Sequence, residues 1–162
     1  MKRALDELPA FEEKIRRLVN QYAEGLVRLA YVSVRNFSDA EDIVQEVFLT
    51  YLRKRPHHDS PEHERAWLIR VTVNKCRDHL RSAWIRRRAE MPKELPGIPP
   101  RDYELLWAVL ALPERYRIPL YLYYEDYSIG ETAALMRLKP STVGTRLERG
   151  RKLLRQRIGD EA

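Results

Sequence analysis

The sequence predicts an all-α fold of two small helical domains joined by a flexible proline-rich linker. Three observations support this. Apolar residues recur every three to four positions in both halves of the 162-residue chain. No segment shows the alternation of a half-buried strand. Proline and glycine crowd one segment, residues 89–101, where they forbid a continuing helix. We therefore expect domains at residues 1–88 and 102–162, with the linker at 89–101.

The first domain is expected to hold three helices. Phe11, Ile15, Leu18, Tyr22 and Leu26 share one face of a long amphipathic helix. Ser38 and Glu41 have the spacing of a capping box, which predicts that a second helix starts at Ser38 and ends near Pro56. Ser60 followed by Pro61 predicts the start of a third helix. The buried residues of the second helix are expected to be Ile43, Val44, Val47, Phe48 and Tyr51, and those of the third Ala66, Ile69, Val73, Cys76 and Leu80.

The second domain is expected to hold four shorter helices. Asp102 can cap the first, which ends by Pro113, and a second covers residues 117–124, with Pro119 in its early turns or bending it. Ser128 and Glu131 form another capping-box pattern. A short turn at 137–140 leads to a basic helix over residues 141–158. The last two helices have the outline of a helix-turn-helix.

Composition excludes several classes of protein. With 44% hydrophobic and 33% charged residues the chain is not disordered. The single cysteine, Cys76, cannot form an internal disulfide, and no zinc-site spacing is present. No catalytic motif occurs, so we expect neither an enzyme nor a cofactor or metal. The opening MKRALDELPAFEEK lacks an apolar signal segment and no long apolar span follows, so we expect a cytoplasmic protein without membrane insertion.

Charge is unevenly distributed although the formal net charge is only +6. Residues 65–88 and residues 137–157 each contain eight basic residues and one acidic residue. An acidic block at residues 39–46 lies within the first domain, before the basic segment 65–88. Two positive segments and one negative segment suggest two kinds of partner.

Each charged segment has one organised face. On the last helix Val143, Leu147, Gly150 and Leu154 point one way, and short polar and basic residues point the other, as in a helix that reads the major groove. On the third helix a basic stripe with nearby Trp67 and Trp84 suits single-stranded or melted nucleic acid. On the second helix an exposed leucine among carboxylates suits a protein-binding surface. A solvated helix face remains the simpler reading for each segment taken alone, and Trp67 is more readily a core residue than a stacking platform.

Three segments together resemble the extracytoplasmic-function sigma factors, promoter-recognition subunits of bacterial RNA polymerase. The segments are DAEDIVQEVFLTYL (39–52), AWLIRVTVNKCRDHLRS (66–82), and LPERYRIPLYLYYEDYS through TVGTRLERGRKLLRQ (112–156). The resemblance implies sigma region 2 and region 4 joined by the linker. It also implies core polymerase and promoter DNA, duplex and melted, as partners, and makes an anti-sigma factor an expected one.

The resemblance assigns a role to each surface. The core polymerase-binding candidates are Asp39, Asp42, Gln45, Glu46 and Leu49. The downstream promoter element would be read by the loop 55–64 and by Arg70, Asn74, Arg77, Asp78 and Arg81, which capture a base as the strands separate. The upstream element would be read as duplex by Ser141, Thr142, Thr145, Arg146, Glu148, Arg149 and Lys152.

The chain departs from the family pattern at three positions. Gly144 stands where Lys or Arg is usual, Thr132 where Ile or Val is frequent, and Lys139 where a hydroxyl N-cap is frequent. Promoter preference is therefore the least transferable property. The alternative function is a freestanding helix-turn-helix regulator that binds duplex DNA as a dimer without polymerase. It explains residues 128–158 but leaves the first domain without a role.

Overall fold

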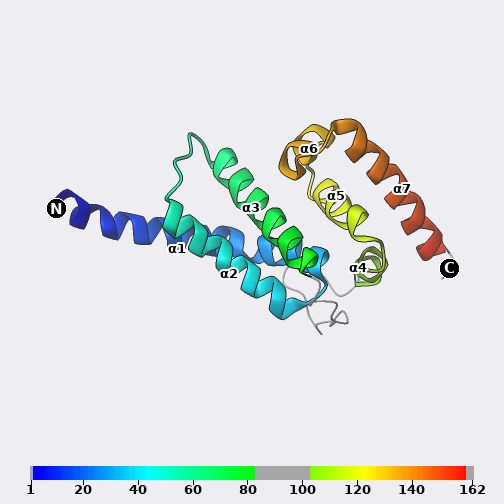
Figure 1. Cartoon of the computed structure of the whole chain (residues 1–162), viewed down its shortest axis with the longest axis horizontal. Coiled ribbons are helices and arrows are strands. Elements are labelled where there is room, and N and C mark those ends of the chain that lie inside the picture. The colour runs from blue at the N-terminus through cyan, green and yellow to red at the C-terminus, as the bar shows by residue number, and fades with distance from the viewer. Residues whose placement is uncertain (1, 83–102, 160–162) are drawn as a thin grey trace.

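Seven α-helices make up the part of the chain that the computed structural model describes, which is residues 2–82 and 103–159, with side chains from residue 7 onward (Figure 1). The N-terminal half contains three long helices, α1 (Lys2–Val34), α2 (Phe37–Lys54) and α3 (Pro61–Arg81). The C-terminal half contains four shorter ones, α4 (Tyr103–Leu110), α5 (Glu114–Tyr124), α6 (Ile129–Met136) and α7 (Pro140–Gly159). The all-α prediction is confirmed. The predicted linker at 89–101 and the Asp102 cap lie outside the described residues.

Two of the four predicted N-cap residues, Ser60 and Ser128, are confirmed by the hydrogen bonds of their side chains. The Ser60 side chain accepts a hydrogen bond from His63 N, and Pro61 occupies the first turn of α3. At α6 the capping box is complete, because Ser128 Oγ accepts from Glu131 N and Glu131 Oε2 accepts from Ser128 N at 2.7 Å. These hydrogen bonds satisfy backbone donors that the first helical turn leaves unpaired.

The predicted capping box at Ser38 is wrong. Helix α2 already begins at Phe37, and its N-cap is Asn36, whose Oδ1 accepts a hydrogen bond from Asp39 N at 2.9 Å. The cause lies one residue earlier, where Arg35 adopts a left-handed conformation (φ 58°) that ends α1 and reverses the chain at once. Ser38 therefore falls inside the first turn. Helix α5 likewise starts at Glu114 rather than 117 and carries Pro119 in its second turn.

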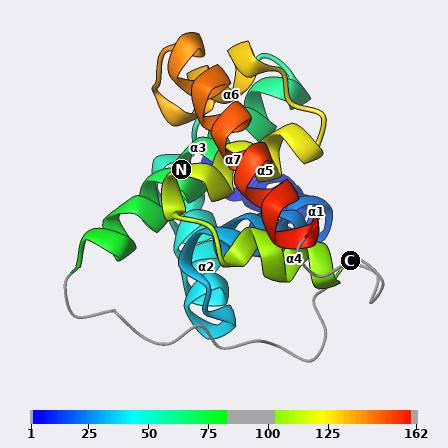
Figure 2. The same cartoon turned by 90° about the vertical axis from the view of Figure 1, so that its right-hand side faces the viewer.

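Both halves of the chain share one apolar core. Helix α1 packs on α2 and α3 and also contacts α5, while α6 contacts α3 (Figure 2). The larger buried cluster joins N-terminal residues such as Leu29, Tyr31 and Val73 to a C-terminal set. That set is Leu110, Ile118, Leu122, Leu135 and Met136. A smaller cluster lies within the C-terminal half, between α5, α6 and α7. The two halves are thus docked on one another.

A carbonyl at the end of a helix accepts a hydrogen bond across the boundary between the two halves from each of Arg35, Arg77 and Arg117. Arg117 of α5 donates to Val32 O and Ser33 O in the last turn of α1. Arg35, just after α1, donates to Leu110 O, the last residue of α4. Arg77 of α3 donates to Met136 O, the last residue of α6. The last carbonyls of a helix lack partners within it, so these cations stabilise the C-terminal ends of α1, α4 and α6.

Candidate protein and nucleic-acid surfaces

The acidic surface lies on the outer face of α2. Asp42, Gln45, Glu46 and Leu49 are all exposed, and Leu49 retains 46% of its accessible surface. The opposite face is buried as predicted, by Ile43, Val44, Val47, Phe48 and Tyr51. Because the buried face of α2 fixes the orientation of the helix, Leu49 is held at the surface among carboxylates.

Asp39 differs from the other candidates of this surface. Its side chain is 13% exposed, and its Oδ2 lies 3.3 Å from Nε2 of His79 on α3. This contact places Asp39 at the packing between α2 and α3. The exposed surface therefore consists of the four residues from Asp42 to Leu49.

The basic stripe of α3 is only partly open to solvent. Arg70, Asn74 and Arg77 are half-buried, whereas Asp78 and Arg81 are exposed and lie 3.8 Å apart as an ion pair. Burial and the nearby Arg146 guanidinium lower the pKa of Arg77 from its usual value. In the docked arrangement Arg77 contacts Met136 O, so a phosphate would have to replace that carbonyl.

The loop between α2 and α3 is anchored by aromatic contacts. The Tyr51 and Trp67 rings meet edge to face at 5.4 Å, and the His58 ring lies about equally near both, at 6.1 Å and 6.0 Å. Trp67 is thus part of a packed cluster, as expected. Burial lowers the pKa of His58, which favours the neutral imidazole.

The helix-turn-helix prediction is confirmed in α6 and α7. Arg137 adopts the left-handed conformation (φ 54°) that ends α6, and α7 begins three residues later. Val143, Leu147 and Gly150 are buried, and Leu154 is half-buried. The outward residues Ser141, Thr145, Glu148, Arg149 and Lys152 are exposed, while Thr142 and Arg146 are half-buried.

Gly150 lets α7 approach α5 closely. A Cβ at this position would lie 3.0 Å from Leu120 Cδ1 and 3.2 Å from Tyr116 Cβ. Gly144 has the opposite environment, because nothing lies within 4 Å of a Cβ built there. Close packing requires one glycine, and the other leaves open space beside α7.

A basic cleft of about 290 Å³ opens at the N-terminus of α7. Arg146 and Arg149 of α7 line it with Arg115 of α5, together with the polar residues Ser141 and Thr145. Helix N-termini favour anions, and the guanidinium groups strengthen that preference. Arg115 is a residue that the sequence did not single out, since only the packing of α5 against α7 brings it here.

Neither a metal site nor a membrane span is found among the described residues. Among residues 7–82 and 103–159, no three His, Cys, Asp or Glu side chains come together as a metal site would require. Within that part of the chain, no helix is both long and apolar enough to cross a membrane.

Comparison with known proteins identifies both halves of the chain. Residues 18–86 match the family model for sigma-70 region 2, and residues 103–154 match the model for sigma-70 region 4. The chain is 30% identical to RNA polymerase sigma factor SigV of Bacillus subtilis, over 88% of this chain and 90% of that protein. It is 31% identical to ECF RNA polymerase sigma factor SigE of Mycolicibacterium smegmatis, over 91% of this chain but 61% of that protein.

Solved structures share the fold. The sigma factor RpoE of Bartonella quintana, crystallised with the anti-sigma factor NepR, superposes with a TM-score of 0.70 at 19% identity, covering 93% of this chain and 97% of that one. CnrH, in complex with the cytosolic domain of CnrY, gives a TM-score of 0.68 at 24% identity, covering 93% and 91%.

The two sigma-region matches occur in order along the chain, and the relatives align over most of their own length. Both findings agree with the architecture, in which a three-helix bundle precedes a helix-turn-helix. The chain belongs to the extracytoplasmic-function family of RNA polymerase sigma factors, the subunits that direct polymerase to promoters.

Proposed function

We propose that the three surfaces divide the work of promoter-specific initiation. The acidic surface of α2 binds core polymerase, the loop 55–64 with α3 reads and opens the downstream promoter element, and α7 reads the upstream element as duplex. The proposal also includes the domain boundaries: region 2 would comprise residues 1–88, and region 4 residues 102–162. The observation that carries it is the separation of charge: residues 39–49 of α2 expose carboxylates and contain no basic residue, whereas basic residues predominate on α3 and α7.

The acidic surface has the composition of a protein contact. Leu49 supplies an apolar centre, and Asp42 and Glu46 supply a charged rim that rejects DNA. Leu49 need not be exposed for the fold, because the other side of α2 already fills the core.

The DNA contacts are of two kinds. Arg115, Arg146 and Arg149 surround a cleft at a helix N-terminus, which suits phosphate and gives salt-dependent affinity. Ser141 and Thr145 stand beside it and can reach base edges. On α3, Asn74 is the candidate for contact with an extruded base, whose binding offsets the cost of unstacking.

This role needs no bond-making chemistry in the chain itself. We propose that it acts in the cytoplasm as a non-enzymatic subunit, and that the polymerase supplies the catalytic metal and substrates. We also propose an anti-sigma partner, because the Bartonella relative of the same fold was crystallised with one.

A pull-down with core polymerase tests the central assignment. The Asp42→Lys/Glu46→Lys double variant should bind core polymerase at least about tenfold more weakly, since it places cations where the partner meets anions. The matched control is Glu12→Lys/Glu13→Lys, the same charge change at exposed positions of α1. Equal binding by both double variants would refute the assignment of α2.

A further inference from the structure

Glu64 is a nearly buried carboxylate at the start of α3, with 5% of its surface exposed. Its neighbours in the first turn, Glu62 and His63, are exposed as a first turn usually is. A buried carboxylate is costly unless it is paired and hydrogen-bonded. Its contacts should therefore reveal why it is tolerated there.

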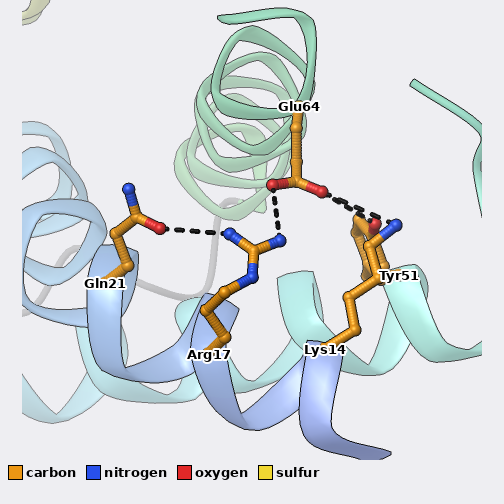
Figure 3. A network of polar contacts seen from close by, with 5 residues as sticks. All are labelled: Lys14, Arg17, Gln21, Tyr51 and Glu64. Carbon is orange, nitrogen blue, oxygen red and sulfur yellow. Dashed lines mark hydrogen bonds and ion pairs between the residues drawn. The ribbon is translucent and has the colours of Figure 1, made fainter. Parts of the chain in front are cut away.

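Three side chains from two other helices converge on Glu64 (Figure 3). Arg17 Nη2 lies 3.3 Å from Oε1, and Lys14 Nζ lies 3.6 Å from Oε2. Tyr51 OH of α2 donates to Oε2 at 3.3 Å. Arg17 is itself held by Gln21, which accepts a hydrogen bond from Nη1. Glu64 thus joins α1, α2 and α3 at a single point.

The same network reaches the loop 55–60. Glu64 accepts the hydrogen bond of the Tyr51 hydroxyl, and the ring of Tyr51 packs against His58 in the middle of that loop. Nε2 of His58 is buried and has no hydrogen-bond partner among the described residues. At the start of the loop, the Arg55 guanidinium lies 4.4 Å from the ring centroid of Phe11 on α1. Helix α1 therefore contacts the start of the loop through Phe11, and the helix that follows the loop through Glu64.

Charge gives a second reason for this arrangement. The loop would meet a polyanionic strand, which a carboxylate without a neighbouring cation would repel. Hydrogen bonding with Tyr51, together with the nearby Glu64 charge, raises the pKa of Lys14 and keeps it cationic. Lys14 and Arg17 neutralise Glu64 from the side of α1, so its negative charge is screened where the loop ends and α3 begins.

We propose that Glu64 is a positioning residue for promoter opening: through Tyr51 and His58 it fixes the loop 55–60 in the shape that holds the extruded base. This inference rests on the proposed function, since it assumes that the loop reads the downstream element. In this proposal the four residues act indirectly, by fixing the shape of the loop rather than by touching DNA. They are Glu64, Tyr51, Lys14 and Arg17.

Base discrimination on preformed bubbles tests the proposal. The full-length chain and core polymerase are assembled on templates whose downstream element is already unpaired, and occupancy is compared between templates that differ in one unpaired base. Glu64→Gln keeps the size of the side chain and removes its charge. It should reduce the preference for the best base about fivefold, the effect of losing one ordinary hydrogen bond.

The matched control is Glu12→Gln, an equal charge change at an exposed position of α1 that lies outside every proposed binding surface. It should leave the preference unchanged. Core binding and duplex binding by α7 should stay within about twofold of the original protein for both variants, because neither surface contacts Glu64. Should Glu64→Gln fail to fold, Arg17→Gln removes a partner from the more exposed end of the network and should lower the preference in the same direction.

The outcomes separate this inference from the proposed function. An original chain that shows no base preference on any bubble would overturn the role of the loop itself. A preference that persists in both Glu64→Gln and Arg17→Gln would overturn the positioning role alone. Loss of core binding in parallel with base preference would show that Glu64 supports the fold as a whole, which also contradicts the proposal.

Discussion

Arg117 of α5 donates from Nε to the carbonyl oxygen of Val32 of α1 at 2.8 Å. Its two terminal nitrogens donate to Leu112 O at 2.8 Å and to Ser33 O at 2.7 Å. The residue is 4% exposed, and burial lowers its pKa to about 10, which leaves it a cation at neutral pH. One guanidinium thus closes the end of a region 2 helix from within region 4.

Replacing Arg117 with alanine should loosen the docking of the two halves. Three carbonyls would lose their partner, and each buried unpaired group costs about 1–3 kcal/mol unless water reaches it. We expect a fall of at least about 3 kcal/mol in the free energy of unfolding and a larger radius of gyration in small-angle scattering. Arg115→Ala, at the exposed side of the same helix, is the stability control. An unchanged radius would mean that apolar contacts alone hold the docked state.

The two glycines of α7 should respond to alanine in opposite directions. Gly144→Ala should stabilise the chain by up to about 1 kcal/mol, because alanine favours the helix and meets no atom. Gly150→Ala should destabilise it by about 1–3 kcal/mol, since its Cβ would meet Leu120 and Tyr116. Urea unfolding of the two variants measures both effects. A stabilising Gly150→Ala would contradict the close packing of α5 and α7.

Cys76 should be unreactive while the chain is folded. Burial raises the pKa of its thiol to about 12, so at pH 8 roughly one folded molecule in ten thousand carries the thiolate. A thiol reagent should react at the rate of unfolding in buffer and rapidly in urea. The raised pKa also means that this group favours the folded state below about pH 9 and that its contribution is lost as the pH rises from 9 toward 12. Fast labelling of the folded chain at pH 8 would disprove the burial.

Arg149 should contribute to upstream binding mainly through charge. Arg149→Ala should weaken binding to upstream-element duplex and reduce the slope of log affinity against log salt by about 1. The control is Arg16→Ala, which removes the same charge from an exposed position of α1, far from α7. An identical slope in Arg149→Ala would remove this side chain from the DNA contact. The measurement is a salt titration by fluorescence anisotropy.

The sequence was sufficient to predict the helices, the buried face of α2 and the helix-turn-helix, because each depends on periodicity and local capping. It misplaced the start of α2, since Ser38 and Asn36 both offer N-cap side chains and the left-handed Arg35 decides between them. It could not reveal the docking of the halves or the burial of Arg117 and Glu64. Both residues have partners far away in the chain, 47 positions from Glu64 and 85 from Arg117, which no local pattern reports.

Run-off transcription tests the central claim most directly. Purified chain is added to core polymerase that lacks any sigma factor, on a library of genomic fragments. The account predicts transcripts with discrete start sites, which disappear with Asp42→Lys/Glu46→Lys and persist with Glu12→Lys/Glu13→Lys. Transcripts that start at the same scattered positions with and without the chain would contradict it.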